Sequence, residues 1–535
     1  MANFIFGALG LVSLLPVCEA QGMLSQFFQI ALSVALTGSL LGSVLGKPNI
    51  VVILTDDHRF DAMGFVGHPF LKTPNMDRLA AEGVHFEKAY VTTSLCSPSR
   101  ASILTGLYAH NHRVVDNYNP VDQSLAFFPE LLQAAGYQTA FIGKWHMGNN
   151  EEKQRGFDHW VSFKGQGVYV PDPAMLKAKG RFVPQATNSG FNVNGKKVAQ
   201  EGYITDELTD YAEDWLAKKD AGKPFFLYVS HKGVHADFLP PDRHAFKYEE
   251  VDIPMPPSPV ANPELFKDPP IWVRNQSNSR HGVEFAYYTG IDLAKYYRRY
   301  CEALLAVDDS VGRLLANLEK SGELEDTVIL YLGDNGFIFG EHGLIDKRCA
   351  YEESVRIPML MRYPKAIAGG TRLSKIVANI DVAPTLLEVA GVGVPSKMDG
   401  RSFWRLAKGE QVTDWRKHLL YEYYWERNYP QTPTTHAVIG ESFKYIRYHG
   451  VWDQDELYDT GADPKERQNL FNDPEQTERV AEMNRALFEI LAESGGQDMP
   501  LMPDRGTKYL HRRTGGSEGA AFPEPFYREA GTTGK

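Results

Sequence analysis

Cysteine is scarce in this chain. Its 535 residues include only four cysteines, too few to hold a fold together through disulfides, so a buried hydrophobic core must stabilise the protein. Cys301 and Cys349 are interpreted as small core side chains, with a disulfide between them as the alternative. Because Cys18 lies in an apolar N-terminal region, only Cys96 remains to be judged by its local sequence.

An excess of basic residues is also absent. The chain has 56 lysines and arginines against 67 aspartates and glutamates, a net charge of −11. This balance excludes general binding to nucleic acids or acidic membranes through long-range attraction. An anionic substrate would therefore need a local group of cations. A hydrophobic content of 43% over this length predicts one large domain and one smaller domain.

Lysine and arginine are missing before the two apolar stretches at residues 4–17 and 27–45. Both stretches resemble export signals, and the small residues around Gly46 favour cleavage after that position. We therefore expect export to a periplasm, a lysosome or the medium, without stable embedding in a membrane. An uncleaved membrane anchor of about 20 residues is the alternative.

Short apolar runs alternate with helical patterns after Lys47. This alternation predicts an α/β fold with a large, mostly parallel sheet flanked by helices. The clearest strand candidates are residues 50–54, 139–142, 225–229 and 328–332. Apolar residues at three- and four-residue spacing predict a helix before the last run, and these residues are Leu304, Val307, Val311, Leu314 and Leu318.

Polar residues follow each strand candidate directly. In chain order they are Asp56 and Asp57, Lys144 and His146, His231 and His235, and Asp334 and Asn335. Ligands of open α/β sheets bind beyond the carboxyl ends of the strands. We therefore expect these side chains, far apart in the sequence, to converge on one pocket.

The sequence changes character near Asp414, where aromatic and mixed-polar runs precede a helical pattern at about residues 477–493. This region predicts a small α+β subdomain. The last 40 residues are rich in glycine, proline and charge, which predicts an extended or partly disordered tail. The predicted organisation is an export signal region at 1–46, a catalytic domain at 47–413, a C-terminal subdomain at 414–495 and a tail at 496–535.

Four oxygen-bearing side chains, those of Asp56, Asp57, Asp334 and Asn335, stand at two of the strand ends. Oxygen ligands without sulfur suit a hard cation, Ca²⁺ first and Mg²⁺ as the alternative. Such residue pairs are also common in turns. Their joint placement after buried runs favours the metal site.

The segment CSPSR at residues 96–100, followed by ASILTG at 101–106, is the most specific feature of the chain. Pro98 suits the first turn of a helix. Cys96 would then face the positive end of that helix, which lowers a thiol pKa and favours anions. These residues alone leave two interpretations, an activated cysteine hydrolase and an ordinary loop that enters a helix.

In this segment the chain resembles the formylglycine-dependent sulfatases of the alkaline phosphatase superfamily, which share the Cys-x-Pro-Ser-Arg signature and the Leu-Thr-Gly box found here at residues 104–106. Further similar motifs are Gly143-Lys144-Trp145-His146, Gly333-Asp334-Asn335-Gly336, Lys347 ahead of Tyr351-Glu352, and Glu456-Leu457-Tyr458-Asp459 with Asp463-Pro464 and Asn469-Leu470. The resemblance spans about residues 47–470. It implies an alkaline phosphatase-like fold and the hydrolysis of sulfate esters.

The resemblance also implies the identity of the nucleophile. A maturation enzyme would convert Cys96 to formylglycine, whose hydrated aldehyde attacks the sulfur of the ester beside the divalent cation. Cys96 thereby joins Asp56, Asp57, Asp334 and Asn335 as a predicted metal ligand.

Further roles follow from the same resemblance. Sulfate oxygens and the formylglycine would be bound by Arg100, Lys144 and Lys347. His146 would help to deprotonate the nucleophile, and His235 would be the general acid at the leaving oxygen. His231 is the alternative acid, because this chain has His-Lys-Gly-Val-His where the family often has proline before the histidine.

The segment HNHRVVDN at residues 110–117 is similar to the corresponding stretch of N-acetylglucosamine-6-sulfatases and related polysaccharide sulfatases. Residues 423–426 (YYWE) and 432–435 (TPTT) point the same way. They predict a sulfated carbohydrate substrate, with a 6-sulfate as the more specific form. The alternatives are an aryl or choline-type sulfatase, a phosphate or phosphonate monoester hydrolase, and a glycan-binding protein without activity.

Overall fold

The computed structural model describes residues 46–148, 150–172, 190–259, 262–276, 281–282, 292–426, 429–450 and 453–500. The chain divides into a unit Met1–Lys47 and a unit Pro48–Lys535, and every element named below belongs to the second. Residues 1–45 of the predicted export region and residues 501–535 of the predicted tail lie outside the described residues. Among the helices of the described residues, none is long and apolar enough to cross a membrane.

A ten-stranded mixed sheet forms the centre of the second unit. Its strands, in spatial order, are β13 (Thr371–Leu373), β2 (Val84–Phe86), β12 (Met359–Arg362), β9 (Thr327–Gly333), β1 (Asn49–Thr55), β8 (Phe225–Ser230), β4 (Gln138–Gly143), β5 (His159–Ser162), β6 (Phe191–Val193) and β7 (Lys196–Val198). The run from β9 to β5 is parallel, whereas β12 pairs antiparallel with both its neighbours and β6 pairs antiparallel with both of its own. The predicted α/β class is confirmed.

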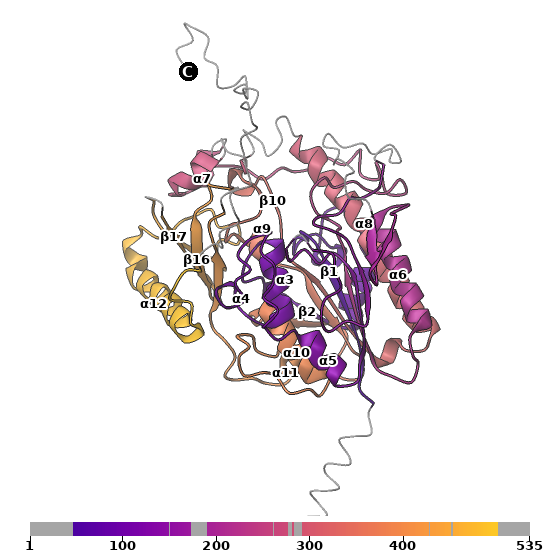
Figure 1. The fold of residues 1–535 in the computed structure, drawn as a ribbon. Coiled ribbons are helices and arrows are strands. Elements are labelled where there is room, and N and C mark those ends of the chain that lie inside the picture. The colour runs from indigo at the N-terminus through magenta and orange to yellow at the C-terminus, as the bar shows by residue number, and fades with distance from the viewer. Residues whose placement is uncertain are drawn as a thin grey trace, which may run out of the picture. The chain divides into compact units, whose positions relative to one another are not determined.

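Both faces of this sheet are covered by helices. On β1, Ile50, Val52 and Leu54 belong to one hydrophobic cluster, and Val51 and Ile53 belong to another. The first cluster includes side chains of α3 (Cys96–Thr105), α5 (Phe128–Ala134) and α10 (Val382–Val389); the second includes those of α2 (Pro74–Glu82), α6 (Ile204–Lys218) and α8 (Leu293–Lys320). Figure 1 shows α3, α5 and α10 on one side of β1 and α6 and α8 on the other. Burial on two faces explains the unbroken apolar run of β1.

Short elements complete this part of the chain. They are α4 (Ala109–His112), α7 (Ile271–Gln276), α9 (Glu352–Val355), α11 (Trp404–Ala407), the pair β3 (Ala89–Tyr90) with β14 (Val377–Ala378), and the pair β10 (Ile338–Phe339) with β11 (Ile345–Asp346). The β10–β11 hairpin follows β9 and leads directly to Lys347. Cys301 and Cys349 are both buried and not disulfide-bonded, as their interpretation as core side chains predicts.

A separate antiparallel sheet follows in the C-terminal region. Its strands are β15 (Leu419–Tyr423), β16 (Thr434–Ile439), β17 (Phe443–His449) and β18 (Glu456–Asp459), in that order. The helix α12 (Thr477–Ser494) contacts β15, β16 and β17 and buries Met483, Leu487 and Leu491 (Figure 1). This sheet and helix form the smaller α+β region that the sequence predicts.

Candidate active site

Most of the predicted site residues follow four adjacent strands of the large sheet, whereas Cys96 and Arg100 lie on α3 and Lys347 follows β11. β9, β1, β8 and β4 are parallel neighbours in that order, so their carboxyl ends lie along one edge. Backbone hydrogen bonds continue past the strands, because the N–H of Asp334 donates to the carbonyl of Thr55 (2.9 Å) and the N–H of Lys144 donates to that of Ser230 (2.8 Å). The hydrogen bonds of the sheet therefore fix the backbone positions from which these side chains extend.

Cys96 is the first residue of α3 and is completely buried. Its Sγ lies 3.4 Å from Asp56 Oδ1 and 3.4 Å from Lys347 Nζ. Burial, reinforced by the charge of Asp56, raises the pKa of the Cys96 thiol far above its ordinary value. Burial therefore disfavours the thiolate at this position, which argues against the activated-cysteine interpretation.

Three buried carboxylates crowd this edge of the sheet. Burial together with the neighbouring carboxylates raises the pKa of Asp57 to about 7, despite Lys347, and that of Asp334 to about 6. Burial would also raise the pKa of Asp56, but Lys144, His235 and Arg100 outweigh it and hold that pKa well below its ordinary value. Such concentrated negative charge needs positive charge beside it.

The oxygen atoms of the site fit a divalent cation. One ligand atom from each of Asp56, Cys96 and Asp334 lies within 4.8 Å of the others. Asp57 Oδ2 and Asn335 Oδ1 are buried and have no hydrogen-bond partner among the described residues. The Asn335 amide is oriented by donating from Nδ2 to Asp57 Oδ1 (2.7 Å) and to the carbonyl of Gly336 (2.8 Å). Two unpartnered oxygens beside crowded carboxylates suit the predicted Ca²⁺ or Mg²⁺.

Three buried cations surround these carboxylates. Arg100 donates from Nε to Asp334 Oδ2 (2.9 Å) and from Nη1 to Ser230 Oγ (2.7 Å) and the carbonyl of Lys144 (2.6 Å). Lys144 Nζ pairs with Asp56, and Lys347 Nζ pairs with Asp57. The structure thus brings all three predicted sulfate-binding cations to the edge that holds Cys96.

The histidines separate into two groups. His235 Nε2 lies 4.0 Å from Asp57 Oδ2, and its side chain is partly exposed. His146 is buried, and its carbonyl accepts a hydrogen bond from Ser97 Oγ. His231 instead hydrogen-bonds through Nε2 to Ser310 Oγ of α8 (3.1 Å), so the structure places it away from the carboxylates. Burial lowers the pKa of both His146 and His235, and the positive charge of Lys144 lowers it further. A bound sulfate would have the opposite effect, because its negative charge favours the protonated imidazole.

Two charged residues beside Lys347 were missed by the sequence analysis. Arg348 donates from Nε to Glu426 Oε1 (2.8 Å), pairs with Asp346, and lies 3.7 Å from the centre of the Tyr429 ring. Asp346 also lies 3.3 Å from His281 Nε2. The consecutive Asp-Lys-Arg was the available signal, but its partners are distant in the sequence. Arg348, directly after Lys347 in the sequence, thus joins Asp346, Glu426 and Tyr429 in one network of contacts.

A second missed cation is Lys232, which lies between the two histidines of the His-Lys-Gly-Val-His segment. It is buried, and its Nζ lies 4.5 Å from the centre of the Tyr169 ring. The Tyr169 hydroxyl donates to the carbonyl of His235 (2.7 Å). Burial lowers the pKa of Lys232 to about 8. Tyr169 therefore holds the backbone of His235 and the side chain of Lys232 together.

The HNHRVVDN segment mainly supports the helix that carries Cys96. His110 Nδ1 bonds to Glu422 Oε2 (2.8 Å), and His112 Nε2 bonds to Ser102 Oγ (3.1 Å). Asn117 Oδ1 accepts from the backbone N–H of Ser97 (3.0 Å). Both histidines are buried and bonded to other protein groups. Their contacts therefore indicate a structural role rather than direct binding of a substrate.

Comparisons with known proteins identify the family of this chain. Residues 48–392 match the family model described as Sulfatase, and residues 340–493 match the model described as N-sulphoglucosamine sulphohydrolase, C-terminal. The N-acetylglucosamine-6-O-sulfatase of Bacteroides thetaiotaomicron is 35% identical over 526 residues, which cover 87% of this chain and 89% of that protein.

Solved structures share the fold. One, described as a complex with its substrate D-glucosamine-2-N,6-O-disulfate, superposes with a TM-score of 0.77 at 32% identity and covers 84% of this chain and 99% of its own. The phosphonate monoester hydrolase of Agrobacterium radiobacter gives a TM-score of 0.67 at 24% identity, covering 84% and 96% of the two chains. At that identity, the second likeness concerns the fold alone.

Proposed function

Because this chain belongs to the sulfatase family, within the alkaline phosphatase superfamily, we propose that it removes sulfate from a sulfated saccharide, specifically a 6-sulfate on a glucosamine-type sugar. The observation that carries the proposal is the convergence of three carboxylates and three cations on the buried Cys96. The named substrates of its relatives support the choice of sugar.

Cys96 is proposed to be matured to formylglycine by a dedicated enzyme. When present, this group supplies a hydrated aldehyde whose hydroxyl acts as the nucleophile. The surroundings of Cys96 suit an oxygen nucleophile at this position, because Lys347 Nζ lies 3.4 Å from Sγ and Asp56 Oδ1 lies at the same distance. An unmodified thiol with so high a pKa would be a poor nucleophile.

Asp56, Asp57, Asp334 and Asn335 would hold the cation, Ca²⁺ by preference, together with the group at position 96. When bound, the cation supplies positive charge and lowers the pKa of an adjacent hydroxyl. Arg100, Lys144 and Lys347, whose side chains are buried, would hold the charge of the sulfate oxygens. His146 would take a proton near position 96, and His235 would give one to the leaving sugar oxygen.

The polar residues around Lys347 support a sugar as the leaving alcohol. Asp346 and Arg348 flank Lys347 in the sequence, and Glu426 is ion-paired with Arg348. Paired carboxylates and a guanidinium suit the several hydroxyls of a sugar ring.

A panel of substrates tests the proposed function. It would contain N-acetylglucosamine-6-sulfate, glucosamine-6-sulfate, a 4-nitrophenyl sulfate and the 6-phosphate of N-acetylglucosamine, each assayed for kcat/KM. We expect the saccharide 6-sulfates to be the best substrates. Turnover of the aryl sulfate alone would contradict the saccharide proposal, and a clear preference for the phosphate would contradict the sulfate assignment.

Replacing His235 by alanine is expected to lower kcat for a saccharide sulfate by about 10²- to 10⁴-fold, the usual contribution of a general acid. The loss should be much smaller for 4-nitrophenyl sulfate, because nitrophenolate leaves without needing a proton. His231→Ala is the matched control and should retain activity, since His231 contacts Ser310 instead. Equal losses for both substrates, or a larger loss in the control, would contradict the role of His235.

Removal of the cation is expected to lower activity by at least about 100-fold, because the nucleophile would lose the charge that lowers its pKa. The measurement is kcat/KM after chelation and dialysis, followed by addition of Ca²⁺ or Mg²⁺, with metal content determined by mass spectrometry. Asp57→Asn should reduce the bound metal in parallel. Full activity in protein verified to be free of metal would exclude this part of the proposal.

Export with cleavage after Gly46 is part of the proposal, on the strength of the apolar N-terminal stretches. N-terminal sequencing of protein from its native host would test it. A mature protein that begins at Lys47 is expected, and an intact N-terminus in the membrane fraction would favour the anchor instead.

A further inference from the structure

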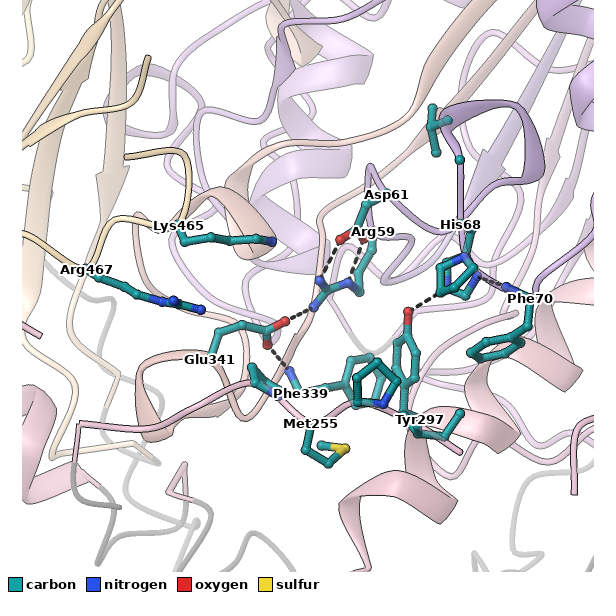
Figure 2. A pocket seen from close by; sticks show the side chains of 16 residues that line it. Arg59, Asp61, His68, Phe70, Met255, Tyr297, Phe339, Glu341, Lys465 and Arg467 are labelled. Carbon is teal, nitrogen blue, oxygen red and sulfur yellow. Dashed lines mark hydrogen bonds and ion pairs between the residues drawn. The ribbon is translucent and has the colours of Figure 1, made fainter. Parts of the chain in front are cut away.

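A pocket of about 350 Å³ is lined in part by Arg59 and Asp61, which follow β1 in the sequence (Figure 2). It is lined by Arg59, Asp61, Phe70, Glu341 and Arg467, among others, and by none of the proposed catalytic residues. We call it the Arg59 pocket. Its volume is within the range of ligand sites and is large enough for one substituted sugar unit.

The floor of the Arg59 pocket is rigidly built. Arg59 forms a two-point ion pair with Asp61, 2.8 Å at each contact, and bonds through Nη1 to Glu341 Oε1 (2.8 Å). Its backbone N–H donates to the Tyr300 hydroxyl (2.9 Å), which in turn donates to the carbonyl of Asp57 (3.1 Å). The floor is thus tied directly to the strand end that carries the proposed metal ligands.

Two further cations enter the pocket from the C-terminal region. Figure 2 shows Lys465 and Arg467 extending toward the Arg59–Glu341 pair. Lys465 is about half exposed, with its Nζ 3.4 Å from Glu353 Oε1. Arg467 has no carboxylate within ion-pair distance among the described residues, and its guanidinium lies 5.9 Å from the Phe266 ring centre. The lining has three cations and two carboxylates, and both carboxylates pair with Arg59. Arg467 is therefore available to bind an anion.

The opposite side of the pocket is aromatic. Phe70, Tyr297 and Phe339 line it, with Phe339 and Tyr297 4.9 Å apart between ring centres. His68 Nε2 bonds to the Tyr297 hydroxyl (2.9 Å), which fixes that ring. Aromatic faces pack on sugar rings, carboxylates such as Asp61 and Glu341 accept from sugar hydroxyls, and cations bind sulfate or carboxylate groups. All three features are present in one cavity.

We propose that the Arg59 pocket binds a second, negatively charged sugar unit of a sulfated oligosaccharide, whose anionic group pairs with Arg467 and Lys465. The inference rests on the proposed function, because it assumes a saccharide substrate. It extends that function from recognition of one sugar to recognition of a neighbouring unit in the same chain. The pocket would raise affinity for longer substrates without taking part in bond cleavage.

Arg467→Gln and the double variant Lys465→Gln/Arg467→Gln test the pocket in turnover. The ratio of kcat/KM for a sulfated tetrasaccharide to that for the monosaccharide sulfate should fall about five- to tenfold, through KM, as charge-assisted contacts are lost. Arg479→Gln is the matched control, because Arg479 is an exposed arginine paired with Glu482 on α12. An unchanged ratio, or an equal fall in the control, would overturn the proposal.

Calorimetric titration of Cys96→Ala protein tests the pocket without turnover, with the sulfated tetrasaccharide, the monosaccharide sulfate and inorganic sulfate as probes. Arg467→Gln in this background should weaken tetrasaccharide binding about five- to tenfold.

If Arg467→Gln weakens only the binding of inorganic sulfate, the saccharide occupant is wrong. If the wild-type chain desulfates no saccharide but the tetrasaccharide effect persists, the pocket stands and the proposed function falls. If saccharides are desulfated and neither binding nor the ratio changes, the pocket proposal alone falls.

Discussion

Replacement of Cys96 by alanine is expected to lower kcat/KM for a saccharide sulfate by at least about 10⁴-fold, as losses of an enzyme nucleophile typically do. The Sγ of Cys96 lies 3.4 Å from both Asp56 Oδ1 and Lys347 Nζ, and the Cβ that carries this sulfur is the atom proposed to become the aldehyde carbon. Alanine is smaller than cysteine, so the buried start of α3 should keep its structure. The assay is kcat/KM together with circular dichroism of the variant.

Mass spectrometry of the peptide that contains Cys96 completes the experiment. Formylglycine leaves this peptide about 18 Da lighter than the thiol form, the difference expected between the two side chains. Cys301→Ala is the control, because Cys301 is a buried residue of α8 outside the site, and it should keep both the modified peptide and the activity. An active wild-type enzyme with unmodified Cys96 would contradict the proposed nucleophile.

The edge of the sheet that holds the site could be predicted because it depends on local patterns. The apolar run of β1 predicts a strand buried on two faces, and Asp56 follows it at once. Parallel neighbours end at the same edge, so Asp334 after β9 and Lys144 after β4 had to come close to Asp56. Neither step needs knowledge of side-chain directions or of loops.

What the sequence could not supply depends on the directions of loops and on distant partners. His231 and His235 are four residues apart, and only the path after β8 turns one toward Ser310 and the other toward Asp57. The side chain of Arg348 is held in place by Glu426, which is 78 residues away in the sequence. The Arg59 pocket joins segments near residues 59, 297, 341 and 467, and no periodic pattern encodes such a meeting.

Replacement of Lys444 by methionine is expected to destabilise the protein by about 3–5 kcal/mol, the usual cost of leaving a buried charge without its partner. Lys444 on β17 is completely buried, and its Nζ lies 2.7 Å from Glu352 Oε1, 2.7 Å from Glu466 Oε1 and 2.9 Å from the carbonyl of Ala350. It therefore joins the C-terminal sheet to the segment that directly follows Lys347. The measurement is the urea midpoint, with activity as a second readout.

The pH dependence gives this prediction its sharpest test. Burial would raise the pKa of Glu352, but Lys444 outweighs it and lowers that pKa, whereas burial raises the pKa of Glu466 to about 8 despite Lys444. Glu352 thus stabilises the wild-type fold above its unfolded pKa, and this contribution is lost as the pH falls through its folded pKa. Without Lys444 the folded pKa of Glu352 should rise, so the carboxylate opposes folding near pH 7.5 and takes up a proton at lower pH. The stability deficit of Lys444→Met should therefore be larger at pH 7.5 than at pH 5.

Lys365→Met, which removes an exposed pair with Asp326, should cost at most about 1 kcal/mol at either pH. A deficit for Lys444→Met as small as this control would mean that the buried lysine does not fasten the C-terminal sheet to the segment that follows Lys347.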